Sequence, residues 1–335
     1  MPALVFETFG ENHMKKSLIA LAVLAASGAA MAQSSVTVYG VADVWFGSTK
    51  ALGAQRVTKL DDGGISASRW GLMGTEDLGG GLKANFLLEQ GLNLDTGTDR
   101  TGSGFRRQAY VGLSGAFGEV KLGNVYSAFD DISGATNSAF DSALSAVNGV
   151  FQSNNYSANP TNNLYYASPE FGGFSGAASY SLKEGTTDGV RAFHVKYNDG
   201  PVYAGVAYQV ESPVGAGASD KFTRINGSYD FGAVKLLASY GKENLATGDK
   251  TNEYQIGADV PLGGALTLSG GYATSKTKNA GAITNKRSGY GVALAYGLSK
   301  RTTVYTGIHS DTTKDAAGVK TAKNSIYAVG LKHTF

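Results

Sequence analysis

The chain has 335 residues, of which 47 are glycine and none is cysteine. Glycine stands at twice its usual share while charged residues make up only 17% of the chain, and this composition does not fit a cytosolic helical enzyme. The lack of cysteine excludes disulfide scaffolds, cysteine-ligated zinc sites and cysteine nucleophiles. A formal net charge of +2 does not suggest a nucleic acid partner.

An export signal begins at the second methionine, Met14. A short basic start is followed there by an apolar run and by the small-x-small pattern at 30–32 that signal peptidase reads. We therefore expect a cleaved signal peptide over 14–32. Cleavage after Ala32 would leave Gln33 as the first mature residue.

The residues ahead of this signal do not suit it. Residues 1–13 include Glu7 and Glu11, whereas the start of a signal peptide is basic. We interpret 1–13 as an extension added by a start codon that was placed too early. The mature chain, 33–335, is expected to form a single domain.

Apolar and small residues alternate along most of the mature sequence. Between 286 and 297, Tyr290, Val292, Leu294 and Tyr296 share one face, and most of the residues between them are small. The same period of two is found in 201–211, 264–275 and 327–335. Period two over about ten residues predicts a strand with one buried face. No run of about 18 apolar residues is present to predict a spanning helix.

Short turns and longer polar segments alternate between these strands. The short turns carry Gly, Asn, Asp or Pro, as at 78–81, 115–118 and 261–264. The longer segments lie near 47–64, 93–104, 127–160, 184–190, 212–220, 243–250, 276–285 and 312–322. These connections leave sixteen strands. Short turns on one side and long loops on the other predict an all-β fold, a transmembrane antiparallel β-barrel of the outer membrane.

A membrane barrel must also close. We expect the terminal strand, about 323–335, to pair with the first strand, about 34–46, because an open edge would leave unpaired N–H and C=O groups in lipid. The alternative is a soluble β-sandwich or propeller built from hairpins. Aromatic residues at the rim of nearly every hairpin favour the barrel, whose two interfacial girdles they suit.

Little in the sequence suggests catalysis. The mature histidines, His194, His309 and His333, lie on different predicted strands, with no HExxH motif and no paired metal-ligand spacing. A barrel-borne hydrolase that uses His194 or His309 with a nearby Ser or Asp stays an alternative. We expect no enzyme activity, no cofactor and no bound metal.

The longest connection, 127–160, is the best candidate for a functional segment, because long connections in compact domains are usually functional. It contains Asp130, Asp131 and Asp141 and neither Lys nor Arg. Strand parity directs Arg69 inward, since the alternate residues are apolar and a charge on the lipid face costs about 2–4 kcal/mol at mid-depth. Acidic and basic groups are thus expected to share the lumen.

Several segments resemble the general diffusion porins of Gram-negative bacteria, and the betaproteobacterial branch most. They are SRWGLMGTEDLGGGLKANFLLEQG at 68–91, FRRQAYVGLSGAFGEVKLG at 105–123, NNLYYASPEFGGF at 162–174, VTVYGVAD at 36–43 and the terminal VGLKHTF at 329–335. The resemblance covers nearly the whole mature chain. It implies a homotrimer of sixteen-stranded barrels in contact with outer-membrane lipid and lipopolysaccharide, each with its third long loop folded into the lumen as a constriction.

The resemblance also implies roles for single residues. Strand parity puts Arg107 on the same face as the apolar residues Ala109, Val111 and Leu113. The resemblance nevertheless places Arg107 in the lumen, with these apolar residues behind the folded loop. The resemblance also implies that Tyr110 faces outward. It makes Phe335 an assembly signal at the periplasmic rim. Many relatives have an arginine where this chain has Asn124 and another within 164–166, so the basic wall is thinner here.

The resulting hypothesis is a passive channel in which an acidic loop faces wall arginines that lack other partners, so that ions and small polar solutes cross a narrow waist. The candidate constriction residues are Arg69, Arg106, Arg107, Lys121, Asp130, Asp131, Asp141, Tyr165 and Tyr166. Alternatively, the arginines only brace the loop. Two further alternatives are a substrate-selective channel with an aromatic track of Phe129, Tyr165 and Tyr166, and an adhesin or anchor with a plugged lumen.

Overall fold

The structure is a computed structural model that describes residues 35–335, except 101, 103, 185–188, 214 and 216. The expected signal peptide over 14–32 and the extension over 1–13 lie outside these described residues. No helix within the described part of the chain is long and apolar enough to cross a membrane.

Antiparallel strands form nearly all of the structure. They are β1 (Ser35–Ala51), β2 (Val57–Asp62), β3 (Arg69–Gly79), β4 (Leu82–Asn93), β5 (Thr98–Asp99), β6 (Gln108–Gly115), β7 (Gly118–Asn124), β8 (Asn163–Ala167), β9 (Phe174–Ser181), β10 (Gly189–Asp199), β11 (Val202–Ser212), β12 (Asp220–Asp230), β13 (Lys235–Asn244), β14 (Lys250–Gly263), β15 (Leu266–Asn279), β16 (Ala282–Gly297), β17 (Thr302–Asp315) and β18 (Lys320–Thr334).

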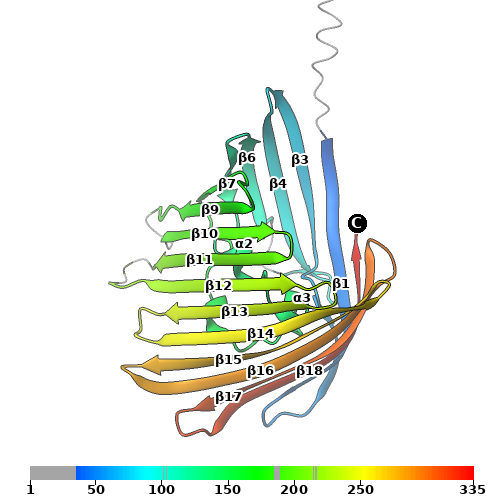
Figure 1. The fold of residues 1–335 in the computed structure, drawn as a ribbon, viewed down its shortest axis with the longest axis vertical. Coiled ribbons are helices and arrows are strands. Elements are labelled where there is room, and N and C mark those ends of the chain that lie inside the picture. Colours follow the sequence, from blue (N-terminus) through cyan, green and yellow to red (C-terminus); the bar gives the residue numbers. More distant parts are fainter. Residues whose placement is uncertain (1–34, 101, 103, 185–188, 214, 216) are drawn as a thin grey trace, which may run out of the picture.

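These strands make the closed sixteen-stranded barrel that the sequence predicts. β2 and β3 act as one wall strand that is interrupted at 63–68, because both pair with β1. The short β5 pairs only with β4. Figure 1 shows neighbouring strands following one another around the wall, as expected where hairpins connect them in chain order.

The hairpin turns use the glycines that the sequence provides. In the β3–β4 turn, Gly79, Gly80 and Gly81 have φ angles of 85°, 60° and 82°, a left-handed region that side chains disfavour. This run of glycine therefore permits a tight reversal where the strands must return.

Closure occurs between the two ends of the chain. β18 pairs with β1 from Val41 opposite Thr334 to Ala51 opposite Asn324. Phe335 adds two backbone hydrogen bonds with Gly40, each of 3.1 Å. The expected pairing of the first and last strands is confirmed, but the first strand extends beyond the expected 34–46 to Ala51, and it pairs with β18 only from Val41 onward. Barrel strands are staggered, so the first half of β1 pairs with β3 and only the second half meets β18.

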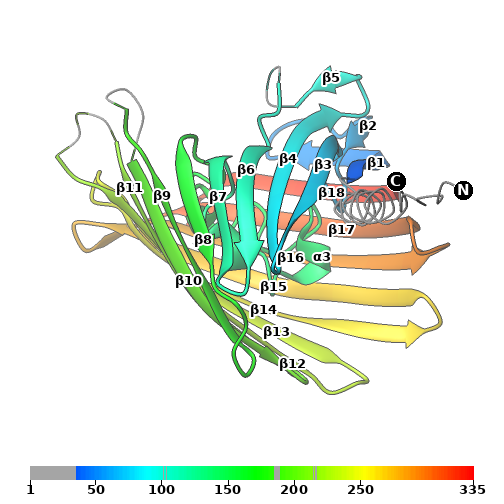
Figure 2. The ribbon, with the colours of Figure 1, turned by 90° about the horizontal axis from the view of Figure 1, so that it is seen from above.

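The wall is uneven in height (Figures 1 and 2). β6, β7 and β8 have 8, 7 and 5 residues, whereas β14 to β18 have 14 to 16. The long loops expected at 276–285 and 312–322 are therefore wrong. β15 and β16 are joined by a turn at 280–281, and their Thr- and Lys-rich ends continue the alternation as strand.

Side chains on the wall alternate between an exposed apolar face and a buried polar one. Val195, Val206 and Ile225 are exposed on the outer face, while His194 and Asn226 are buried on the inner face. This is the alternation of a membrane barrel, with apolar residues toward lipid and polar residues toward the lumen.

The segment between β7 and β8 packs against the inner face. It contains the short helices α2 (Asp130–Ser133), α3 (Ser138–Asp141) and η1 (Gln152–Asn154). Phe129 and Ile132 are buried with Phe222 of β12 in one apolar cluster. Ala139 and Leu144 are buried with Trp45, Ala293 and Tyr305 in a second cluster. The apolar core thus lies between this segment and the wall.

A buried carboxylate holds the interruption between β2 and β3. The Asp43 side chain accepts hydrogen bonds from the backbone N–H groups of Gly64, Ile65 and Ser66 at 3.2, 3.0 and 2.7 Å. It also accepts a hydrogen bond from the Tyr305 hydroxyl. Because Asp43 accepts these N–H groups, the chain can leave the wall at the end of β2 and rejoin it at the start of β3 without unsatisfied backbone donors.

Removing the Tyr305 hydroxyl should destabilise the barrel. Tyr305→Phe keeps the ring but leaves a buried carboxylate short of one donor, which costs about 1–3 kcal/mol. Unfolding in urea, followed by tryptophan fluorescence of the refolded protein, measures the loss. Tyr296→Phe, at an exposed outer position, is the control and should change stability by less than about 0.5 kcal/mol. Equal unfolding curves for the two variants would contradict the proposed role of the Asp43 contact.

Candidate pore constriction

Two arginines converge on one carboxylate inside the barrel. Arg107 Nε lies 2.8 Å from Glu89 Oε1, and Arg69 Nε lies 3.2 Å from Glu89 Oε2. The Tyr39 hydroxyl donates a hydrogen bond of 2.9 Å to the same carboxylate. Glu89 is buried. The assumption that the two arginines lack other partners on the wall is therefore wrong.

The direction of Arg107 follows from where β6 begins. The strand starts at Gln108, so its alternation does not extend back to Arg107. Val111 and Leu113 are 59% and 44% exposed on the outer face. The expectation that these apolar residues lie behind the folded loop is therefore wrong.

Tyr110 also differs from expectation. It does not face outward but packs against the inner apolar cluster. The Lys121 ammonium lies 5.2 Å from its ring centroid and 5.1 Å from that of Tyr165. Lys121 also pairs with Glu119 at 2.9 Å. The inner wall here is therefore basic and aromatic together.

The loop carboxylates have partners of their own. Asp130 accepts a hydrogen bond of 2.5 Å from the Tyr156 hydroxyl, and Asp131 accepts one of 2.7 Å from Tyr165. Asp141 accepts a hydrogen bond of 2.7 Å from the side-chain amide of Asn137. Among the described residues, none of the three forms an ion pair with Arg69 or Arg107. That the loop acids and the wall arginines act on solutes together stays a prediction.

Burial changes the acidity of the loop carboxylates. It raises the pKa of Asp130 to about 6, although the Tyr156 hydrogen bond and the charge of Arg107 oppose the shift. Partial desolvation likewise raises the pKa of Asp131 and of Asp141, although both residues keep surface exposed to solvent. Asp130 therefore changes charge close to neutral pH.

The structure separates Tyr165 from Tyr166. Adjacent strand residues point to opposite faces, so Tyr165 is buried on the inner face of β8 while Tyr166 is 42% exposed on the outer face. The expectation that Tyr166 lines the constriction is therefore wrong. Phe129 is fully buried against Tyr156 and Phe222, so it offers no surface to a passing solute.

Arg106 and the histidines take less central positions. The Arg106 residue is exposed, and its backbone carbonyl accepts hydrogen bonds from the amides of Asn124 and Asn159 at 3.0 and 2.8 Å. His194 Nδ1 lies 2.7 Å from the carbonyl oxygen of Ala128. On β17, His309 Nε2 lies 3.1 Å from Oδ2 of Asp311, two residues further along the same strand.

Sequence reasoning missed a wall residue that holds the loop by three side-chain hydrogen bonds. Arg224 of β12 is fully buried, and its guanidinium donates to the Ser133 carbonyl oxygen at 3.0 Å, to Ser153 Oγ at 2.9 Å and to Asn154 Oδ1 at 2.7 Å. It also lies 4.9 Å from the ring centroid of Phe151. The alternation along β12 could have indicated that Arg224 points inward, since Phe222, Arg224 and Asn226 share the face opposite to the exposed Ile225.

A buried glutamate complements this arginine. Glu253 of β14 accepts hydrogen bonds from the backbone N–H groups of Gln152 and Ser153. The Ser153 hydroxyl donates to it at 2.6 Å. Because Ser153 also receives the Arg224 hydrogen bond, the cation and the anion hold the η1 end of the loop from neighbouring sides.

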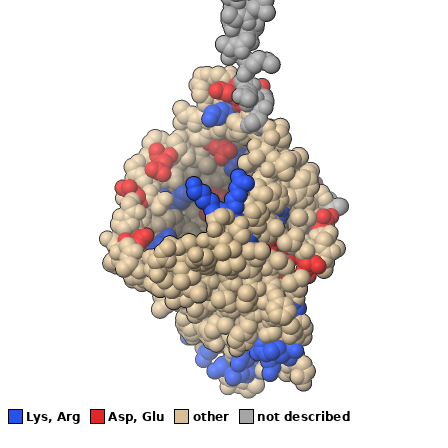
Figure 3. Space-filling model, turned by 90° about the vertical axis from the view of Figure 1, so that its right-hand side faces the viewer, with Lys and Arg blue, Asp and Glu red and all other residues tan. Residues whose placement is uncertain are grey.

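This arrangement is that of a channel with a fastened inner segment and a charged lumen. Figure 3 shows a hollow in the upper half of the view, with acidic and basic side chains around it. The sequence pattern of the Gram-negative porin family matches residues 18–316. The chain belongs to this family.

Similar proteins agree with the match. The porin is 38% identical to outer membrane porin protein 32 of Delftia acidovorans over 95% of each chain, and 30% identical to an outer membrane porin of Bordetella pertussis over 96% of this chain and all of that one. The solved anion-selective porin from Comamonas acidovorans is 28% identical, with a TM-score of 0.78 over 90% of this chain and all of that one.

The family settles the class of activity. The protein is a passive diffusion channel of the Gram-negative outer membrane and is not an enzyme. The hydrolase alternative based on His194 or His309 is accordingly wrong, and the barrel fold excludes the soluble sandwich and propeller.

Replacing Arg224 should loosen the loop. Arg224→Met leaves the buried Glu253 carboxylate without its nearby cation, and breaking such an arrangement costs about 3–5 kcal/mol. Limited proteolysis of the refolded porin should then cut within 127–160 much faster than in the wild type. Arg191→Met, on the exposed outer face of β10, is the matched control. Protection of the loop in Arg224→Met would contradict this role.

Proposed function

We propose that this porin passes small anions more readily than cations. The observation that carries the proposal is that Arg69 and Arg107 share a single carboxylate, Glu89. Two guanidinium groups and one carboxylate leave the cluster with a residual positive charge. A fixed charge at a constriction raises the local concentration of the opposite ion and so favours its passage. The similar porin of Comamonas acidovorans is anion-selective, which supports the same sign for this chain.

We infer that the segment 127–160 narrows the lumen at this level. Its contacts with the inner face of β9 to β16 support the inference, as do the Arg224 and Glu253 attachments. The carboxylates of Asp130 and Asp131 are held by tyrosine hydroxyls and not by arginines. The arginine cluster therefore keeps its charge, and the loop acids reduce the anion preference from the opposite side.

We further propose a homotrimer that contacts lipid and lipopolysaccharide. The short strands β6 to β8 carry exposed apolar side chains on their outer face, among them Val111, Leu122 and Leu164. A low apolar wall of this kind suits a neighbouring subunit, while the tall wall of β14 to β18 suits lipid. Phe335 keeps its expected role as an assembly signal.

The rival functions receive less support. An aromatic track requires Phe129 and Tyr166 beside Tyr165, but Phe129 is buried and Tyr166 lies on the outer face. A plugged adhesin would show no conductance, so bilayer recordings separate it directly from the channel.

Substitutions within the cluster should shift ion preference in opposite directions. Arg69→Gln with Arg107→Gln leaves Glu89 as the only charge and should move the reversal potential in a salt gradient toward cations. Glu89→Gln leaves two arginines and should move it toward anions. Both shifts should shrink in high salt, as the screening length falls from about 10 Å at 0.1 M to about 3 Å at 1 M.

The outer-face variant Arg191→Gln is the control for these recordings and should match the wild type. Shifts of the same sign in the double variant and in Glu89→Gln, or none in either, would contradict the selectivity proposal.

Asp130 should make the selectivity depend on pH. Its carboxyl has a pKa of about 6, so it is charged above that pH and neutral below it. As the pH falls from 7 to 5 the lumen loses a negative charge, and the anion preference should increase. Recordings of Asp130→Asn should lack the part of this change that is centred near pH 6. An identical pH profile in this variant would assign the change to another group.

A further inference from the structure

One part of the inner wall departs from the alternation of exposed apolar and buried polar faces. Met73 of β3 is 41% exposed, although it lies on the same face as Arg69, four residues before it on the strand. That face is the inner one, because Arg69 pairs there with Glu89. Met73 thus presents an apolar side chain to the water of the lumen.

Met73 belongs to an apolar row across three neighbouring strands. It lies directly opposite Leu87 of β4, and Leu87 lies directly opposite Tyr110 of β6. Residues in directly opposed positions point to the same face of a sheet, so these three side chains stand side by side on the inner wall. Neighbouring strands are about 4.8 Å apart, which makes the row about 10 Å long. A row of this length suits an aromatic ring that carries one substituent.

The apolar row lines a pocket, which we call the Met73 pocket. It has a volume of about 590 Å³ and is formed by residues of β1, β3, β4, β6 and β7. Glu89, which binds both arginines of the proposed constriction, lies on the same face only two residues from Leu87. In the other direction β4 leads back to the tight turn at 80–81. The pocket therefore lies beside the arginine cluster, toward the end of the barrel with the short turns.

Polar groups line the Met73 pocket next to the apolar row. Thr75 Oγ1 donates a hydrogen bond of 3.0 Å to Asn85 Oδ1, and Asn85 Nδ2 donates one of 2.8 Å to Ser114 Oγ. These bonds fix the amide of Asn85 and use the Ser114 oxygen as an acceptor. Within the described residues no hydrogen bond uses the Ser114 hydroxyl as a donor, so its proton is available to a solute oxygen.

Lys83 supplies a positive charge to the Met73 pocket. It is exposed and forms no ion pair with any of the described residues. Asp77 lies opposite Lys83 but outside the pocket lining, and its carboxylate accepts the Gly79 N–H at 2.9 Å. Glu119, which does line the pocket, is paired with Lys121 at 2.9 Å. A solute carboxylate therefore meets one cation that the wall has not neutralised.

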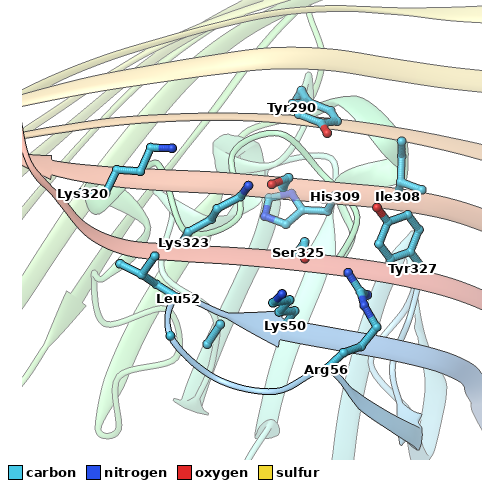
Figure 4. A pocket seen from close by; sticks show the side chains of 13 residues that line it. Lys50, Leu52, Arg56, Tyr290, Ile308, His309, Lys320, Lys323, Ser325 and Tyr327 are labelled. Atoms are coloured by element: carbon cyan, nitrogen blue, oxygen red, sulfur yellow. The ribbon is translucent and has the colours of Figure 1, made fainter.

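A second pocket of the wall, drawn in Figure 4, has a different character. Lys50, Lys320 and Lys323 gather there beside Tyr327, which is exposed on the outer face of the barrel. A solute inside the lumen does not reach that face. The outer pocket thus lies off the path of permeating solutes, whereas the Met73 pocket lies on it.

We propose that the Met73 pocket is a transient binding site for aromatic carboxylates that cross the channel. The proposal rests on the anion preference proposed above and adds the class of solute that the lumen favours. The ring packs on Tyr110 and on the thioether of Met73. Lys83 and the Ser114 hydroxyl bind the carboxylate. This site shares no residue with the aromatic track considered above.

Block of the chloride current by benzoate in planar bilayers tests this site in the full mature porin. Benzoate should reduce the current saturably, at an about tenfold lower concentration than acetate, which has the same charge and no ring. Met73→Thr should raise the benzoate concentration for half block about tenfold, because contact with about two methylene groups is lost. Lys83→Gln should raise it about threefold, the typical share of one exposed ion pair.

Val36→Thr is the matched control, since its side chain is 65% exposed on the outer face of β1, and it should respond to benzoate like the wild type. Three outcomes would overturn the proposal. They are equal half-block concentrations in Met73→Thr and Val36→Thr, benzoate that acts no better than acetate, and equal block by benzamide, which keeps the ring and lacks the charge.

Reversal potentials in a potassium chloride gradient are recorded from the same membranes without benzoate. A failure of the proposed anion preference would appear in these potentials. A failure of the Met73 pocket would appear only in the benzoate block.

Discussion

The closed barrel of this porin depends on the need to pair all backbone N–H and C=O groups that face hydrocarbon. An unpaired group there costs several kcal/mol, so the sheet must have no edge. β1 has partners on both of its edges: β3 and then β2 pair along one edge, and β18 pairs with its second half along the other. The change from β3 to β2 falls at the interruption beside Asp43, whose carboxylate accepts the N–H groups of Gly64, Ile65 and Ser66 that no strand pairs.

The same requirement explains why the inner segment is fastened by polar groups. The segment that packs against the inner face leaves the regular hydrogen bonds of a sheet, so its backbone groups need partners among inward side chains. Arg224 donates a hydrogen bond to the Ser133 carbonyl oxygen, and Glu253 accepts hydrogen bonds from two backbone N–H groups. Attachment of the segment is therefore assigned to Arg224 with Glu253, whereas the ion selectivity that we propose rests on other charges, those of Arg69, Arg107 and Glu89.

Alternation and turn glycines were enough to predict the barrel, its strand number and its closure, because both signals are local. The ends of the tall strands were not predictable, since Thr and Lys above the apolar band have the composition of loops although they continue as strand, as Lys276 does. The partner of Arg69 and Arg107 could not be found either. Glu89 reaches them only through the pairing of β4 with β3 and β6, which the sequence does not reveal.

The uneven wall has a consequence for how solutes approach. A strand of 15 residues at about 3.3 Å per residue, tilted by about 40°, rises close to 40 Å, whereas the apolar band is about 25 Å tall. The wall of β14 to β18 must therefore continue beyond the hydrocarbon as rigid sheet, while the side at β6 to β8 stays low. The pore mouth is therefore asymmetric: rigid sheet stands above the membrane surface along β14 to β18, while the rim at β6 to β8, the side that the proposed neighbouring subunit would face, is lower.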